Sequence, residues 1–285
     1  MDPITLDSDL AKQLESGMHT GEAIELPFPV IYLWALNGQP SYKSTGGALY
    51  NGGWACKAED LQALCDQQRL ATPAGWKHAV IATRDGGEFE AVTTRSVIVA
   101  PIAFRTSWLL DSKRFPEYVE GGRRHVQLLA MLGMRTTEGG PIDPWNPVVL
   151  TAKGYQAKNL MGATETWSKF IGGVRMKIAP NVPSWCFYTS VGTFGERVSL
   201  NVGKPGAQSP ITPIIPYLPD NLDEAMLSRL FVGQDTATAM GKYLTQATEW
   251  LKAWKEADVD QFAAGRVQDA EGVYIPDEPV DEIPF

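Results

Sequence analysis

The pattern of apolar and polar positions predicts a chain built mainly of short strands, with a few helices. Apolar runs bounded by turn residues predict strands at 25–36, 78–83, 88–94, 96–110, 123–134, 147–153, 184–191, 197–202 and 211–218. Apolar residues at helical spacing predict helices at 4–20, 58–69, 155–171 and 222–255. Gly172-Gly173 is expected to end the third of these helices. The predicted fold class is therefore α+β, with strands in the majority.

The elements between residues 96 and 218 follow the order of three strands, a helix and two strands. This is the order of an OB-fold, a five-stranded barrel with a helix between its third and fourth strands. We therefore expect an OB-like core at 96–218, with residues 1–95 either extending the barrel or forming a small flanking domain. Residues 219–257 are expected to form a C-terminal helical region. Residues 258–285 lose the periodicity and are expected to be a disordered linker and acidic tail.

The composition indicates a buried core and no membrane-spanning segment. Apolar residues make up 44% of the 285 residues. No apolar run reaches the ~18 residues that cross a bilayer. The N-terminus is acidic and lacks the basic-then-apolar form of a signal peptide. The 3 cysteines are odd in number and match no common zinc spacing, so we expect reduced thiols, no metal and a cytoplasmic location.

The net charge of −8 is distributed very unevenly along the chain. Residues 105–204 carry 13 basic and 7 acidic side chains. Residues 1–104 carry 7 basic and 12 acidic side chains, and residues 205–285 carry 5 and 14. A basic middle therefore lies between acidic ends, and the most acidic stretch comes last. This asymmetry is typical of a body that binds a polyanion and carries an acidic tail.

The last residues of the chain combine acids and prolines with a final Ile-Pro-Phe. A terminal Phe next to so many acids has no core to join, so the segment is better explained as a ligand for another protein. Its ring would fill an apolar pocket on the partner, its α-carboxylate would meet a basic side chain, and the acids would meet a basic rim. The predicted docking residues are Asp277, Glu278, Asp281, Glu282, Ile283, Pro284 and Phe285.

This ending resembles the C-terminal tip of bacterial single-stranded DNA-binding proteins, which end in a run of acids followed by Ile-Pro-Phe. Phage proteins that bind single-stranded DNA (ssDNA) also end in acids and a terminal Phe. The resemblance implies ssDNA binding and protection without sequence preference, in a bacterium or phage. It also implies recruitment of replication, recombination and repair proteins through the tail. The resemblance covers only residues 277–285; the N-terminal hundred residues depart from the bacterial pattern.

The basic middle contains the two kinds of side chain that such binding needs. Cations follow the phosphate backbone, and flat side chains stack on the bases. The predicted ssDNA contacts are Arg105, Trp108, Arg123, Arg124, Lys153, Tyr155, Lys158, Trp167, Lys169, Arg175, Lys177, Trp185, Phe187, Tyr188 and Arg197. On a strand, Trp185 and Phe187 share one face and Tyr188 takes the other, and the pattern leaves open which face packs the core. The acidic tail is also expected to compete with DNA for this basic region.

Two alternatives remain beside a non-catalytic ssDNA-binding protein. One is an accessory factor that carries the docking tip but binds DNA weakly or not at all. The other is a magnesium-dependent nuclease built around Asp85, Glu88 and Glu90. The histidines are not at metal-ligand spacing, and no Walker A or Gly-x-Ser-x-Gly sequence is present. These observations favour a DNA-binding protein that has no catalytic activity and no cofactor. A homodimer is a further expectation.

Overall fold

The computed structural model describes residues 25–37, 52–82, 88–110, 113–135, 140–194, 200–202 and 209–256. The strands are β1 (Ile31–Leu36), β2 (Gly53–Lys57), β3 (Lys77–Ala82), β4 (Glu88–Thr94), β5 (Ser96–Leu110), β6 (Lys113–Phe115), β7 (Arg123–Arg135), β8 (Ile142–Lys153), β9 (Thr189–Gly192), β10 (Leu200–Val202), β11 (Ser209–Ile211) and β12 (Ile215–Pro216). The helices are α2 (Ala58–Gln68), α3 (Gly154–Ile178), α4 (Glu224–Leu230), α5 (Gln234–Gln246) and α6 (Thr248–Glu256), and η1 (Ser184–Cys186) is a 3₁₀ turn. The predicted helix at 4–20 lies outside the described residues.

The structure is a mixed α+β fold in which strands dominate. One 10-stranded sheet has the order β12-β9-β5-β7-β8-β1-β2-β4-β3, with β6 paired to β5. β10 and β11 form a separate two-stranded sheet. The strands predicted at 78–83 and 88–94 are present as β3 and β4, which pair antiparallel. Only Arg95 separates β4 from β5, so the N-terminal strands continue directly into the sheet of the predicted core.

The centre of the sheet has a Greek-key connection. β5, β7 and β8 are neighbouring antiparallel strands with only the short β6 between them along the chain, and β9 returns after α3 to pair antiparallel with β5. The spatial order β9-β5-β7-β8 places the fourth strand beside the first, as in a Greek key. On the other side of β8 lies β1, which pairs parallel to it. Residues from the N-terminal part of the chain therefore extend the sheet beyond the segment 96–218.

The sheet curls, and Trp54 shows how far. Trp54 on β2 is completely buried, and its Nε1 donates a 3.0 Å hydrogen bond to the carbonyl of Val191 on β9. In the strand order, β5, β7, β8 and β1 lie between these two strands. A flat sheet spaces neighbouring strands about 4.8 Å apart and would hold β2 and β9 well beyond hydrogen-bond distance. The described sheet is therefore curled like half of a barrel.

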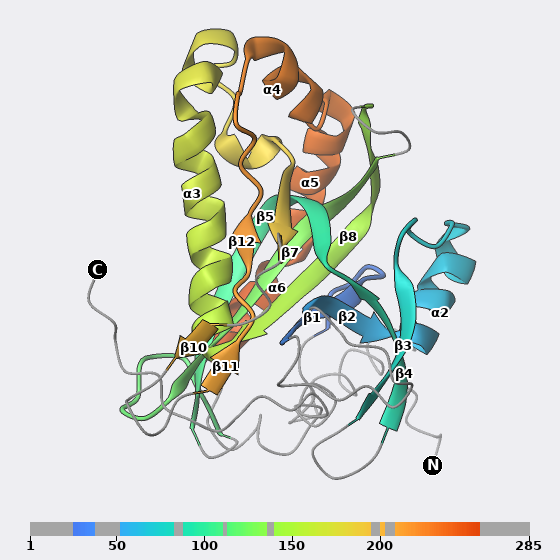
Figure 1. Ribbon diagram of the computed structural model, residues 1–285, viewed down its shortest axis with the longest axis vertical. Helices are drawn as coiled ribbons and strands as arrows, with labels where there is room; N and C mark the ends of the chain where they lie inside the picture. The colour runs from blue at the N-terminus through green and yellow to red at the C-terminus, as the bar shows by residue number, and fades with distance from the viewer. Residues whose placement is uncertain are drawn as a thin grey trace, which may run out of the picture.

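Both faces of the central strands are buried. Val126, Leu128 and Ala130 of β7 belong to a core cluster that α2 and α3 cover. Leu129, on the opposite face, packs with Trp250 and the other residues around α6. Figure 1 shows the same arrangement, with α3 along one side of the sheet and α6 behind the central strands. The apolar runs Leu128–Leu132 of β7 and Pro147–Leu150 of β8 are what burial on two faces requires.

Helix α3 continues past the glycine pair that was expected to end it. Gly172 and Gly173 lie inside the helix, which runs to Ile178. A glycine in a helix costs about 1 kcal/mol relative to alanine, and packing of the flanking apolar side chains compensates for it. Ile171 is buried, and Val174 and Ile178 pack against the same cluster. The prediction of a stop at 172–173 is therefore wrong because tertiary contacts override the local preference.

The C-terminal part of the chain is helical, as predicted, but it is divided into three helices. α4 ends before Phe231, and Gly233 adopts a positive φ of 82° immediately before α5. The predicted strand at 184–191 is also changed, because its first residues form η1 and only Thr189–Gly192 pair as β9. This change matters for the site, because it breaks the alternation of side chains on which the placement of the aromatic residues depended.

Candidate nucleic-acid interface

The residues predicted to contact ssDNA lie in two groups at opposite ends of α3. One group comes from β5, β7 and the first turns of α3. The other comes from the last turns of α3 and from η1. At 1.5 Å per residue, the 25 residues of α3 extend roughly 37 Å. Figure 1 shows β10 and β11 beside the first turns of α3 and α4 beside its last turns.

The first group is organised by a three-stranded ribbon. At the end of β5, Trp108 pairs with Phe115 on β6 and with Arg124 on β7. We call residues 107–110 and 113–125 the basic ribbon. The segment contains Lys113, Arg114, Arg123 and Arg124 within a short stretch of chain, against Glu117 and Glu120. The pairing register places Lys113 and Arg124 on the same face as Trp108, whereas Arg114 and Arg123 both pair with Leu109 and lie on the other face.

An aromatic and cationic cluster lies at the centre of the basic ribbon. The guanidinium carbon of Arg124 lies 4.9 Å from the centre of the Trp108 ring, in a cation–π contact. On another side, the ring of Tyr118 meets Trp108 edge-on, with centroids 4.8 Å apart and planes at 85°. Tyr118 is 67% exposed, whereas Trp108 is half-buried. The cluster thus presents a tyrosine ring and a guanidinium plane, held in place by a tryptophan between them.

Further cations lie where the ribbon meets α3. Arg123 is half-buried and Lys113 is exposed. Lys153, at the end of β8, pairs with His125 rather than with Arg124, so it extends to the opposite face of the sheet. Tyr155 and Lys158 follow in the first turns of α3, and both are half-buried. The N-terminus of this long helix adds a partial positive charge to the same end of the molecule.

Comparisons with protein-family models, with characterised proteins and with solved structures found no match to this chain.

Arg105 is a correction to the predicted interface. The side chain is buried, Nε donates a 2.8 Å hydrogen bond to Gln127 Oε1, and Nη1 donates a 2.8 Å hydrogen bond to the carbonyl of Trp250. Its guanidinium carbon lies 3.8 Å from the centre of the Trp250 ring. Burial lowers the pKa of the guanidinium. Arg105 fastens α6 to the sheet and offers no surface to a phosphate.

A buried polar network continues from Arg105 toward the end of the ribbon. Arg114 Nη1 donates a 2.7 Å hydrogen bond to Ser107 Oγ and lies 2.9 Å from His125 Nδ1. All three side chains are buried. Burial and the charge of Arg114 hold the pKa of His125 well below its usual range. His125 is therefore neutral at physiological pH, and its Nδ1 accepts the hydrogen bond from Arg114.

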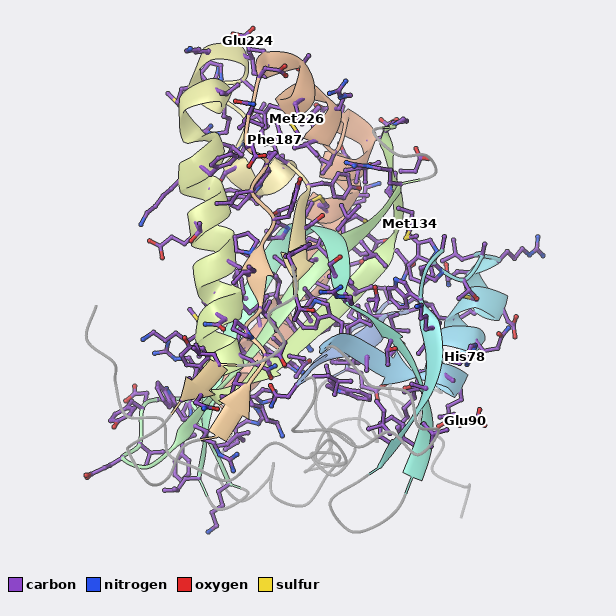
Figure 2. The ribbon with its side chains drawn as sticks, in the orientation of Figure 1. His78, Glu90, Met134, Phe187, Glu224 and Met226 are labelled. Atoms are coloured by element: carbon purple, nitrogen blue, oxygen red, sulfur yellow. The ribbon has the colours of Figure 1, made fainter. Side chains whose placement is uncertain are left out.

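Three of the predicted stacking residues are in the core, so their prediction as surface contacts is wrong. Trp167, Phe187 and Tyr188 are at most 3% exposed and belong to one apolar cluster with residues of α4 and α5. Figure 2 shows Phe187 inside the molecule, between α3 and the C-terminal helices. The turn η1 explains why both Phe187 and Tyr188 point inward, since β9 begins only after them.

The second predicted group lies along the second half of α3 and on η1, which is joined to the helix by a 2.7 Å hydrogen bond from Ser168 Oγ to Ser184 Oγ. Trp185 on η1 is 55% exposed, and Lys169 and Lys177 are exposed on α3. Lys169 Nζ forms a 2.6 Å ion pair with Glu165, and Arg175 Nη1 donates a 2.7 Å hydrogen bond to the carbonyl of Val182. These side chains are on the surface, but α3 separates them from the basic ribbon.

Several predicted residues lie outside the described part of the chain. Arg197 and the whole docking tail, 277–285, are among them. Of the acids considered for a nuclease, Asp85 lies outside too, whereas Glu90 is exposed on β4, as Figure 2 shows.

Among the described residues, no three His, Cys, Asp or Glu side chains gather as a metal site requires. No helix in the described ranges is long and apolar enough to cross a membrane.

Sequence reasoning missed the two residues that complete the basic ribbon, Tyr118 and Lys113. Both lie in the short segment between the predicted strands at 96–110 and 123–134, which was not assigned to an element. The tripeptide Lys113-Arg114-Phe115 places two basic side chains directly before an aromatic one, and that local signal was available. What the sequence could not show was the pairing of this tripeptide with β5, which places it beside Trp108.

Proposed function

We propose that this protein binds single-stranded DNA without sequence preference and that the basic ribbon is the primary contact. The observation that carries the proposal is the cluster of Trp108, Arg124 and Tyr118. A base stacks on an aromatic ring or an arginine plane whatever its identity, because every base has a π-face. The neighbouring cations supply the salt-dependent attraction to phosphates. This mode of binding does not require hydrogen bonds to the edges of particular bases.

The topology supports an OB-like interpretation of the core. A Greek-key meander of β5, β7 and β8, followed by α3 and a fourth strand beside the first, is the arrangement expected for such a barrel. The position beside β8 is taken by β1, from the N-terminal part of the chain, rather than by a strand at 211–218. In this proposal the N-terminal strands complete the curled sheet, and the ribbon extends from its rim.

The acidic tail gives the proposed protein its second activity, the recruitment of replication, recombination or repair proteins. The supporting observation is the resemblance of Asp281, Glu282 and Ile-Pro-Phe to the tips of known ssDNA-binding proteins. α6 is the last described element before this segment, and Arg105 and Trp250 fasten it to the sheet.

Titration of labelled oligo-dT with the purified chain, at two salt concentrations, tests the proposal. Binding should weaken as salt rises, with a log–log slope of about −0.7 for each phosphate contact. Arg124→Ala should lower affinity and reduce the steepness of that slope. Lys252→Ala is the matched control, because Lys252 is an exposed cation on α6, outside residues 107–125, and pairs with Glu249 at 3.1 Å.

The result that would overturn the proposal is an absence of salt-sensitive ssDNA binding. In that case the accessory factor that carries only the docking tip becomes the better explanation. The nuclease alternative has its own measurement, since added Mg²⁺ would then lead to cleavage of the labelled oligonucleotide. Equal losses in Arg124→Ala and Lys252→Ala would show that general charge, and not the ribbon, is responsible.

A further inference from the structure

An exposed apolar surface lies along the edge of the sheet, outside the basic ribbon. Ile215, Tyr217 and Leu218 are 44%, 52% and 37% exposed, although they lie within four consecutive residues. They belong to β12 and the residues directly after it, at the end of the strand order next to β9. We call residues 213–219 the edge segment. Contiguous exposed apolar side chains on a protein surface mark a binding site more often than isolated ones do.

The prolines of the edge segment argue against a second strand as its occupant. Pro213, Pro216 and Pro219 recur at every third position. Proline has no N–H to donate, so a neighbouring strand could not form a continuous ladder here, and prolines on edge strands prevent that kind of association. Proline also fixes φ, which keeps the backbone extended before any ligand binds. The segment therefore presents rigid side chains rather than free backbone groups.

Hydrogen bonds hold the edge segment at both ends. Thr212 N donates a 3.0 Å hydrogen bond to Asn37 Oδ1, and Gln156 Nε2 donates a 3.3 Å hydrogen bond to the carbonyl of Thr212. At the other end, Tyr217 N donates a 2.8 Å hydrogen bond to the carbonyl of Ser190. The ring of Tyr217 contacts the ring of Phe194, with centroids 5.7 Å apart and planes at 48°. Tyr217 is nevertheless 52% exposed, so about half of its side chain is open to solvent.

The edge segment runs between the two groups of basic and aromatic residues. It starts beside Gln156, in the first turn of α3, where the basic ribbon joins the helix. It ends beside Ser190, five residues after Trp185, which is at most ~17 Å along an extended chain. Lys177 is exposed on the last turn of α3. Figure 1 shows β12 alongside α3, and the chain after β12 rising toward α4.

We propose that the edge segment is a second stacking surface for ssDNA, with Tyr217 as its main contact, and that it carries a longer strand from the basic ribbon toward Trp185. This inference rests on the proposed function. A flat, preorganised aromatic surface that continues a cationic one suits a chain of stacked bases. Acidic side chains are close, since Asp220 is exposed directly after the segment. The segment therefore contributes stacking, and the ribbon contributes most of the phosphate contacts.

Oligo-dT of two lengths tests this division. OB-type sites cover about 4 to 16 nucleotides, so an oligonucleotide of about 4 is short enough for the ribbon alone and one of about 16 can reach both surfaces. Tyr217→Ala should weaken binding of the long oligonucleotide about tenfold and leave the short one unchanged. The salt slope should stay as in the unmodified protein, because stacking releases no counterions. Tyr217→Phe keeps the ring and should restore full affinity.

Leu244→Ala is the matched control, since Leu244 is an exposed apolar residue on α5. It should change neither affinity. Crosslinking of the unmodified protein to a long oligonucleotide that contains iodouracil gives a second measurement, independent of any variant's folding. It should attach to a peptide that contains residues 213–219.

The inference is wrong if Tyr217→Ala binds the long oligonucleotide as tightly as the unmodified protein, or loses affinity equally for both lengths. A crosslink confined to the basic ribbon would also contradict it. Each of these outcomes leaves the proposed function intact. If the unmodified protein binds neither oligonucleotide, the proposed function itself fails, and the two failures are therefore distinguishable.

Discussion

Arg105 and Trp250 are joined by two contacts at once: the guanidinium stacks 3.8 Å from the ring centre and also donates a hydrogen bond to the carbonyl of the same residue. The two residues are 145 positions apart in the sequence. Trp250 is 1% exposed and contacts Leu129 and Val149 through its apolar cluster. The pair therefore attaches the C-terminal helices to the central strands.

Trp250→Ala should lower the free energy of unfolding by about 3–5 kcal/mol, because it removes a large buried side chain and leaves a cavity. Urea unfolding followed by far-UV circular dichroism measures this directly. Tyr243→Ala on the neighbouring α5 should have a smaller effect, since Tyr243 is only half-buried. Equal stability of the Trp250 variant and the unmodified protein would show that α6 contributes little to folding.

Arg105→Met should separate a structural role from a DNA-binding role. The substitution leaves Gln127 and the carbonyl of Trp250 without their buried donor, so stability should fall by about 1–3 kcal/mol. The folded fraction should still bind oligo-dT within about twofold of the unmodified protein, since Arg105 is covered. Parallel unfolding and binding titrations make the comparison. If Arg105→Met lost affinity for oligo-dT while its stability stayed unchanged, Arg105 would belong to the DNA interface.

The contrast between Arg105 and Arg124 shows what the sequence could predict. The long strands and α3 were predictable, because apolar runs with two buried faces and helical periodicity are local patterns. The burial of Arg105 was not, because a basic residue on a strand is usually at the surface, and its covering residue lies far away in the chain. Arg124 and Trp108 were named from the sequence, but their stacking depends on the register between β5 and β7.

The aromatic residues after α3 illustrate a second limit. A strand through 184–191 would place Trp185 and Phe187 on one face. Because η1 interrupts that strand, Trp185 is exposed while Phe187 is in the core. A three-residue turn of this kind has no strong signature in the sequence, but it determines which of the following side chains point into the core. The sequence likewise could not show that the N-terminal strands join the sheet, because β1 pairs with β8, which is more than a hundred residues away in the chain.

His125 should make the protein sensitive to acid. Its folded-state pKa is held well below the usual range by burial and by Arg114, whereas in the unfolded chain it titrates near 6.5. Below about pH 6.5 the unfolded state therefore binds a proton that the folded state does not. Stability should be level above this pH and should fall below it, with a limiting slope of about 1.4 kcal/mol per pH unit.

His125→Gln should flatten this dependence, even if the substitution lowers stability at every pH. Urea midpoints between pH 5 and pH 8 give the two profiles. His78→Gln is the control, because His78 is exposed on β3, as Figure 2 shows. Its profile should keep the slope of the unmodified protein. A slope that persists in His125→Gln would assign the acid sensitivity to other groups.

Removal of residues 277–285 should tighten ssDNA binding at low salt. These residues bring four acids, and an acidic segment that occupies the basic ribbon must leave before DNA can bind. The gain should shrink as salt rises, because screening weakens the internal contact. Phe285→Ala keeps all four acids and should leave ssDNA affinity unchanged while it weakens docking to a partner. Fluorescence anisotropy of labelled oligo-dT at two salt concentrations distinguishes the variants. Unchanged or weaker binding after the deletion would show that the tail does not compete for the ribbon.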